Sequence, residues 1–206
     1  MIEAINLVKK YNNETVISDF NLKIMKGEIL ALTGESGKGK TTVLNMLGML
    51  ERPDGGQIVV EGNSNLRKKE IMHLQRHKLG YLFQNYALIE NETVKANLKI
   101  ALGGRKILNK ISAMKEALHF VNLKPNILDK KVYQLSGGEQ QRVAIARLFL
   151  KEADYIFADE PTGNLDVQNR NIVFDLLKKM SDMGKAVVFV THDLELAQKS
   201  TRWIEL

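Results

Sequence analysis

One glycine-rich stretch constrains the fold of this chain more than any other feature of its sequence. An apolar run ends at Leu32, the sequence Gly-Glu-Ser-Gly-Lys-Gly-Lys-Thr occupies positions 34–41, and apolar residues with helical spacing follow. This order matches G-x-x-x-x-G-K-[ST], the phosphate-binding P-loop, in the strand–loop–helix context that the motif requires. A glycine-rich hairpin or linker is the alternative, but the spacing that begins at Val43 predicts a helix from about Lys40 to Leu50. The stretch therefore indicates a nucleoside triphosphate site.

The residue types of this stretch suit phosphate binding for physical reasons. Its glycines let the backbone fold tightly, so that successive N–H groups can point at a β-phosphate, and the helix N-terminus adds its positive end to the same place. Lys40 supplies a cation for the β- and γ-phosphates, and the Thr41 hydroxyl can ligate Mg²⁺. The phosphate-binding residues expected from the motif are Gly34, Glu35, Ser36, Gly37, Lys38, Gly39, Lys40, Thr41 and Thr42.

Length and composition restrict the class of protein. The 206 residues, 44% of them hydrophobic and 26% charged, are typical of a single globular domain over 1–206. The absence of cysteine excludes disulfides, thiol catalysis and cysteine-based zinc sites. No apolar run approaches the roughly 18 residues of a membrane span, and the first residues lack the pattern of a secretory signal. We therefore expect a soluble, cytoplasmic chain.

The net charge of +6 is spread along the chain rather than gathered in one block. Its densest cluster runs from Arg67 to Lys78 around apolar residues whose spacing predicts an amphipathic helix. A solvated helix face is the first interpretation, proximity to lipid headgroups the second, and nucleic acid the third. We therefore expect no nucleic-acid partner.

The order of predicted elements indicates an α/β fold. Residues 1–33 contain three β-type runs separated by turns, 57–61 form another predicted strand, and helical patterns dominate from 65 to about 131. Farther on, fully apolar runs that end at Ala158 and Val190 alternate with helical patterns. This alternation is typical of a parallel sheet that is covered on both faces. Residues 202–206 are predicted to form an edge strand.

Chemically capable side chains follow the predicted strands, where open parallel sheets bind ligands. Asp159, at the tip of its strand, suits Mg²⁺, whereas Glu160 faces the opposite way and can polarise a water for attack on a γ-phosphate. His192 can hydrogen-bond the γ-phosphate, and Gln84 arrives from the helical region. Two carboxylates can also begin a solvated loop, and a lone histidine is often incidental. Their combination with a P-loop favours the functional interpretation.

A second phosphate-type cradle begins another predicted helix. Residues 135–139, Leu-Ser-Gly-Gly-Glu, place a serine and two glycines at the helix N-terminus. Because one domain holds one γ-phosphate and already has one P-loop, we infer that this cradle serves the nucleotide of another copy. Ser136 and Glu139 also match a capping box, so an ordinary helix start is the alternative, and both can hold together.

Together and in this order, these motifs resemble the ATP-binding subunit of ABC transporters. They are Gly34–Thr41, Gln84, Leu135–Gln141, Asp159-Glu160, Asn164-Leu165-Asp166 and His192. The resemblance covers essentially the whole chain, and Leu-Ser-Gly-Gly-Glu-Gln is its most specific motif. Residues 83–88 and 158–166 look most like one branch, which contains the lipoprotein-release, macrolide-export, cell-division and antimicrobial-peptide-export ATPase subunits. Within that branch, the bacteriocin-export group is the narrower hypothesis.

The resemblance implies a fold and a function. The fold is a P-loop NTPase of the ABC type, with a mainly parallel core sheet, an N-terminal antiparallel β-subdomain and an inserted α-helical subdomain at about 65–150. Two copies are expected to form a head-to-tail homodimer that encloses two molecules of ATP with Mg²⁺. Hydrolysis would drive a transmembrane permease on the inner face of the cell membrane, in an exporter of peptide or bacteriocin, lipoprotein or drug.

The resemblance also implies roles for matching residues on the nucleotide side of the site. Tyr11 would stack on adenine, and Gly34 to Thr42 would hold the phosphates. The residues that would serve Mg²⁺ are Thr41, Gln84 and Asp159.

The catalytic and interface roles are implied in the same way. Glu160 would be the catalytic base, His192 would sense the γ-phosphate, and Gln84 would contact the attacking water and respond to the permease. Asp166 would stabilise the dimer interface. The residues that would reach the other copy's γ-phosphate are Ser136, Gly137 and Gly138.

Two features of the sequence depart from the family pattern. Lys38 stands where the family usually has a small residue, and we expect its side chain to point to solvent. The sequence ends soon after His192, so regulation through a further C-terminal domain is not expected.

Two other functions share the chemistry of this family and are the alternatives to transport. They are an ATP-driven mechanical signal to a cell-wall enzyme and the action of a soluble ABC-type protein on ribosomes or DNA. Relatives of the latter kind typically carry two fused ATPase domains or long coiled-coil insertions, which this sequence lacks.

Overall fold

The computed structural model describes residues 1–103, 107–163 and 165–206. Within them, eight strands form an antiparallel sheet of order β2-β1-β4 and a parallel sheet of order β5-β6-β7-β3-β8. The strands are β1 (Ile2–Tyr11), β2 (Glu14–Ile24), β3 (Ile29–Thr33), β4 (Gly55–Val60), β5 (Leu79–Leu82), β6 (Tyr155–Asp159), β7 (Ala186–Val190) and β8 (Arg202–Glu205). The predicted α/β class and the edge position of the last strand are confirmed.

Seven α-helices and two short 3₁₀ turns connect these strands in the described part of the chain. The helices are α1 (Lys40–Leu47), α2 (Lys68–His77), α3 (Val94–Leu102), α4 (Lys110–Phe120), α5 (Gly137–Lys151), α6 (Val167–Asp182) and α7 (Leu194–Gln198), and the turns are Pro125–Ile127 and Val132–Gln134. None of the described helices is long and apolar enough to span a lipid bilayer.

The parallel sheet is buried on both faces, which explains why its strands are apolar without alternation. Along β3, Leu30 and Leu32 pack into one hydrophobic cluster together with side chains of α1 and the antiparallel sheet. Ile29 and Ala31 point to the other face, into a cluster that contains residues of α5 and α6. Because successive side chains of a strand point to opposite faces, one short run of five residues supports two cores.

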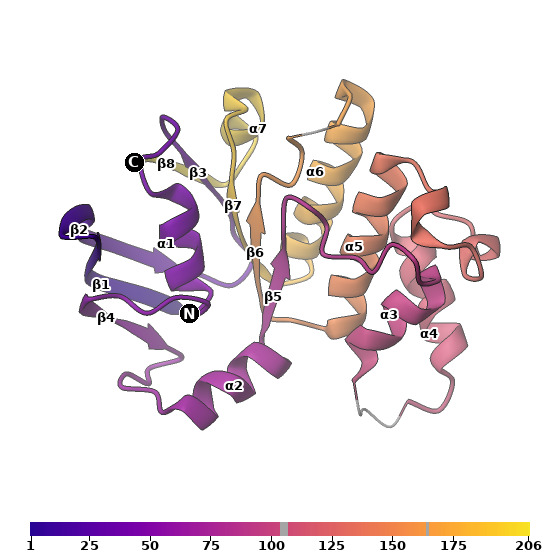
Figure 1. Ribbon diagram of the computed structural model, residues 1–206, viewed down its shortest axis with the longest axis horizontal. Coiled ribbons are helices and arrows are strands. Elements are labelled where there is room, and N and C mark those ends of the chain that lie inside the picture. The colour runs from indigo at the N-terminus through magenta and orange to yellow at the C-terminus, as the bar shows by residue number, and fades with distance from the viewer. Residues whose placement is uncertain (104–106, 164) are drawn as a thin grey trace.

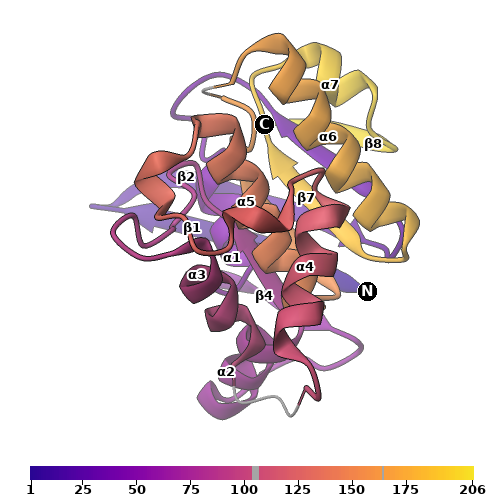
Figure 2. The same ribbon diagram turned by 90° about the vertical axis from the view of Figure 1, so that its right-hand side faces the viewer.

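The molecule has a β-rich end and a helical end, joined by the parallel sheet (Figure 1). The antiparallel sheet lies beside α1, and α3, α4 and α5 pack together on the opposite side of the molecule (Figures 1 and 2). Both ends belong to the two hydrophobic clusters that meet at the parallel sheet. The carboxyl ends of β3, β6 and β7 therefore lie between the two ends.

Two predicted boundaries are wrong, and glycine-linked backbone geometry explains both. The helix predicted to reach Leu50 ends at Leu47, because Gly48 caps it and Met49 adopts a left-handed backbone with φ 59°. The strand predicted from residue 57 begins at Gly55, where a register shift against β1 accommodates Gly56 at φ 76°. These details depend on the local backbone and not on apolar spacing, so periodicity does not report them.

Candidate nucleotide-binding site

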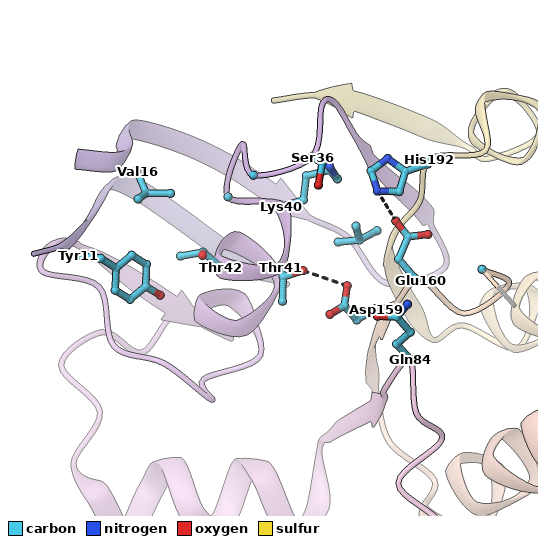
Figure 3. A pocket seen from close by; sticks show the side chains of 14 residues that line it. Tyr11, Val16, Ser36, Lys40, Thr41, Thr42, Gln84, Asp159, Glu160 and His192 are labelled. Atoms are coloured by element: carbon cyan, nitrogen blue, oxygen red, sulfur yellow. Dashed lines mark hydrogen bonds and ion pairs between the residues drawn. The ribbon is translucent and has the colours of Figure 1, made fainter. Parts of the chain in front are cut away.

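A polar cavity of about 570 Å³ opens where β3, β6 and β7 end (Figure 3). This size lies within the usual range of small-molecule sites, about 300–1,000 Å³. The chain segments that line it are the β1–β2 hairpin, the P-loop with the start of α1, the second residue after β5, and the last residues of β6 and β7 with the residues that follow them. The lining residues are Tyr11, Val16, Ser36, Gly37, Gly39, Lys40, Thr41, Thr42, Gln84, Asp159, Glu160, Gly163, Val190 and His192.

The P-loop has the backbone geometry that its glycines permit. Gly34 and Gly39 have φ values of 132° and 85°, which side-chain-bearing residues rarely adopt. A Cβ on Gly34 would lie 2.6 Å from the Leu206 carbonyl oxygen, and one on Gly39 would lie 2.7 Å from Ile17 Cδ1. Gly39 also precedes the first residue of α1, so the helix N-terminus faces the loop. The P-loop prediction is confirmed as a strand, a tight turn and a helix.

Lys40 is a buried cation that is held by the loop itself. Its residue is only 6% exposed, and its Nζ donates hydrogen bonds to the carbonyl oxygens of Gly34 at 2.9 Å and Glu35 at 2.7 Å. Burying an ammonium group is costly unless it is hydrogen-bonded, and these carbonyls supply that compensation. The charge is thereby kept at the wall of the cavity, where it can pair with phosphate oxygens.

The side chains of Thr41 and Asp159 meet across the cavity although they lie 118 positions apart in the sequence. The Thr41 hydroxyl donates a hydrogen bond to Asp159 Oδ1 at 3.1 Å (Figure 3). Burial raises the pKa of the Asp159 carboxyl, while the Thr41 hydrogen bond and the Lys40 charge lower it. Hydroxyl and carboxylate oxygens are the donors that Mg²⁺ prefers, so the pair fits this ion. The described residues contain no group of three His, Cys, Asp or Glu that could hold a metal ion by themselves.

Glu160 and His192 form a second pair that lines the same cavity. His192 Nε2 lies 3.0 Å from Glu160 Oε1, and the histidine side chain is 57% exposed whereas the glutamate side chain is 15% exposed. Burial raises the pKa of the Glu160 carboxyl, and the neighbouring His192 partly offsets this rise. The Glu160 backbone has φ 44°, an uncommon conformation that turns the chain away from the strand direction. The adjacent carboxylates thus have different partners but line the same cavity, and because Glu160 follows the end of β6, its direction is set by this left-handed turn and not by the alternation of the strand.

The cavity has an apolar side formed by the β1–β2 hairpin. Tyr11 is 43% exposed, and its hydroxyl donates to Glu51 Oε1 at 2.5 Å, which fixes the ring at the cavity wall. Val16, on the neighbouring strand, also lines the cavity and was not predicted from the sequence. Its place in a β-strand beside the tyrosine turn is the signal that could have identified it.

Several predicted site residues are not among those that line the cavity, namely Gly34, Glu35, Lys38, Ser136, Gly137, Gly138 and Asp166. No described residue of 135–141 lines the cavity, because the second cradle lies at the start of α5. There Ser136 caps the helix by accepting a hydrogen bond from the Glu139 N–H, and Glu139 accepts one from the Ser136 N–H. The predicted capping box is confirmed. Asn164 lies outside the described residues.

Lys38 points to solvent, as expected. Its side chain is 57% exposed, and its Nζ lies 3.7 Å from the Glu35 carboxylate, whose side chain is 82% exposed. Such an exposed pair contributes little to stability. In Lys38 and Glu35, therefore, the backbone groups and not the side chains take part in the P-loop.

Comparisons with known proteins agree with this geometry. The family model described as ABC transporter matches residues 17–163. The lipoprotein-releasing system ATP-binding protein LolD of Aquifex aeolicus is 37% identical over 211 residues, which cover 100% of this chain and 93% of LolD. The macrolide export ATP-binding/permease protein MacB of Campylobacter jejuni is 36% identical over 210 residues, again 100% of this chain but 33% of MacB. The chain therefore spans about a third of the length of its MacB relatives.

Solved structures extend the likeness from the sequence to the whole fold. A dimeric structure of MJ0796, a bacterial ABC transporter cassette, superposes with a TM-score of 0.89 at 35% identity and covers 100% of this chain and 94% of that one. A dimeric post-hydrolysis state of the same cassette, bound to ADP and Pi, gives the same TM-score at 34% identity. The expected mixed fold, with a parallel core sheet and an antiparallel β-subdomain, is confirmed. The chain belongs to the ABC transporter family and is one of its ATP-binding cassettes.

Proposed function

We propose that this chain hydrolyses ATP in a head-to-tail homodimer and thereby drives a membrane permease. One observation carries the composite part of the proposal: the cradle at the start of α5 presents a serine and two glycines at a helix N-terminus, but it contributes no described residue to the cavity that holds the P-loop. A second copy, turned end to end, would bring its own cradle to the open side of this cavity. The dimeric cassettes of MJ0796 support this arrangement.

Within one cavity, each side chain has a separate task. Lys40 and the backbone N–H groups of the P-loop bind the β- and γ-phosphates, and Tyr11 presents its ring to the adenine base. Thr41 and Asp159, with Gln84 nearby, would hold Mg²⁺, which neutralises charge on the phosphate oxygens when it is bound. These residues bind and orient the substrate, while the proton chemistry belongs to Glu160 and His192 in the same cavity.

Glu160 is the general base in this proposal. Its carboxylate accepts a proton from water as the water oxygen bonds to the γ-phosphorus and the bond to the β–γ bridging oxygen breaks. Burial raises the pKa of Glu160, which makes the carboxylate a better proton acceptor than an exposed one. His192, at 3.0 Å, orients the carboxylate and faces the position of the γ-phosphate.

The partner and cargo are proposed from the names of the relatives. LolD is named for lipoprotein release and MacB for macrolide export, and both names denote ATP-binding components. We therefore place this chain at the inner face of the cell membrane through a permease, in an exporter of peptide or bacteriocin, lipoprotein or drug. Cargo specificity would reside in the permease, because the described cavity is accounted for by nucleotide.

Mixing two defective variants tests the composite site. Lys40→Ala removes the phosphate cation of the P-loop, and Ser136→Arg places a bulky charge in the cradle. Each variant alone should lose almost all ATPase activity. In a mixed dimer, one site would combine an intact P-loop with an intact cradle, so mixing equal amounts should restore activity up to roughly a quarter of the wild-type rate for random pairing.

Two controls accompany the mixing experiment. A double variant, Lys40→Ala/Ser136→Arg, mixed with wild type should restore nothing beyond the wild-type share, and thermal unfolding should show that each variant is folded. Full activity of Ser136→Arg alone would contradict the composite site. Purification of the chain from its native membrane with an attached permease would support the partner, and recovery on ribosomes instead would contradict it.

A further inference from the structure

The second glycine of the α5 cradle is in direct contact with a side chain from α6. A Cβ on Gly138 would lie 2.5 Å from Asn169 Oδ1 and 2.6 Å from Asn169 Cγ. These distances are shorter than real Cβ contacts, so the Asn169 amide occupies the space that any larger residue at position 138 would need. The position of the cradle therefore depends on where Asn169 lies.

Asn169 is held at both ends of its amide. Its Oδ1 accepts a hydrogen bond from the Arg142 guanidinium at 2.6 Å, and its Nδ2 donates one to Asp166 Oδ2 at 2.6 Å. Arginine can only donate and an ionised aspartate can only accept, so the bridging group needs an acceptor on one side and a donor on the other. The asparagine amide has both in a fixed geometry. These charge-assisted bonds are among the stronger hydrogen bonds in proteins.

A second contact fastens the same two segments together. Gln141, which is completely buried on α5, donates a hydrogen bond from Nε2 to the Pro161 carbonyl oxygen at 2.6 Å. Pro161 directly follows Glu160, so the start of α5 is attached both to the chain leaving the catalytic carboxylate and, through Arg142 and Asn169, to the start of α6. The cradle and the Asp166 turn thus lie on one cross-linked unit.

We propose that Asn169 is a positioning residue that fixes the cradle of Ser136 to Gly138 relative to Asp166, so that both meet the opposite subunit together. The inference rests on the proposed head-to-tail dimer, in which the cradle approaches a γ-phosphate and Asp166 lies at the interface. If the cradle were free to shift against Asp166, closing the dimer would have to order one against the other, and ATP-driven association would weaken. The bridge removes that cost in advance.

The simplest rival explanation is that Asn169 serves only to begin α6. Asp166 caps that helix by accepting a hydrogen bond from the Asn169 backbone N–H at 2.9 Å, and any residue at position 169 other than proline keeps this N–H. Asn169→Ala therefore removes the side-chain bridge and leaves the cap. The neighbouring Gln168 is exposed on the same turn, so Gln168→Ala is a matched control for helix propensity.

The experiment measures ATP-driven dimerisation in a Glu160→Gln background, which suppresses turnover, by analytical ultracentrifugation over a series of Mg·ATP concentrations. We expect Asn169→Ala to raise the ATP concentration for half-maximal dimerisation about tenfold, which corresponds to about 1.4 kcal/mol. Binding of a fluorescent ATP analogue to dilute, monomeric chains should not change, because Asn169 is not among the described residues that line the cavity. Gln168→Ala should match the parent in both measurements.

A charge exchange distinguishes the bridge from simple packing. Asn169→Asp places a carboxylate beside Asp166 and should weaken dimerisation at least as much as Asn169→Ala. The double variant Asp166→Asn/Asn169→Asp restores a donor at 166 and an acceptor for Arg142 at 169. Because Asp166 itself lies at the proposed interface, the loss in the double variant is compared with both single variants and should be clearly smaller than the sum of the losses of Asp166→Asn and Asn169→Asp. Half-maximal dimerisation of Asn169→Ala within twofold of Gln168→Ala, or a double variant whose loss equals that sum, would overturn the inference. A parent that fails to dimerise with ATP would instead refute the proposed dimer itself.

Discussion

Replacing Glu160 by glutamine is the sharpest test of the chemistry in this cavity. Glutamine has the same shape and keeps an acceptor for His192 Nε2, which lies 3.0 Å from the glutamate oxygen, but it cannot accept a proton from water. A positioned general base contributes about 10²–10⁴-fold to a rate, which is about 3–5 kcal/mol of the barrier. We expect turnover to fall by that factor, while ATP binding stays within about twofold of the parent.

The assay is phosphate release at saturating Mg·ATP, with nucleotide retention measured by gel filtration of the same samples. Glu195→Gln, an exposed carboxylate on α7, is the matched control and should keep the parental rate. Thermal unfolding should show an unchanged or slightly higher midpoint, because burial already disfavours the ionised Glu160. More than about a tenth of the parental turnover in Glu160→Gln would refute the base assignment, since general-base catalysis would then contribute less than its usual minimum.

Three further predictions concern side chains of the site and of the core. His192 lowers the pKa of Glu160, so His192→Ala should raise that pKa and move the acid limb of the residual ATPase pH profile to higher pH; a shift to lower pH would contradict the pairing. Tyr11→Ala should weaken binding of a fluorescent ATP analogue by about 1–3 kcal/mol, whereas Tyr11→Phe, which keeps the ring but loses the hydroxyl and its bond to Glu51, should bind nearly normally in the same titration. Leu30 is completely buried in β3, so Leu30→Ala should lower the free energy of unfolding by about 2–5 kcal/mol in a denaturant titration, with exposed Leu194→Ala as control.

The local features of this fold were accessible from the sequence because each depends on residues that are close together. The P-loop combines a β-type run, glycines and a helix start within a few positions, and the turn at Asn12-Asn13 is marked by two residues that tolerate the left-handed backbone they adopt, with φ 48° and 68°. The strand order β5-β6-β7-β3-β8, by contrast, could not be predicted from residues that are close together in the sequence. It depends on which apolar strands lie side by side, and all of them have similar composition.

In the candidate site, too, some features could be predicted from the sequence and others could not. Asp159 and Glu160 could be identified from their place after an apolar strand, but their different partners depend on the left-handed backbone at Glu160, which strand alternation does not predict. The contact between Thr41 and Asp159 could be predicted only from the motif around each residue together with the family resemblance that connects the two motifs. The bridge from Arg142 through Asn169 could not be predicted, because an asparagine at the start of a helix is ordinary and only the packing of α5 against α6 brings an arginine to its oxygen.

The different partners of Asp159 and Glu160 also bear on how such proteins can diverge after gene duplication. A change of a single base can convert a glutamate codon into a glutamine codon, and here it would leave the Thr41–Asp159 contact untouched. One copy of a duplicated gene could in this way come to encode, in one step, a chain that no longer hydrolyses ATP but still binds nucleotide and pairs with the active chain. Such a change would convert a pair of equivalent ATPase subunits into one subunit that hydrolyses ATP and one that only responds to nucleotide as a regulator.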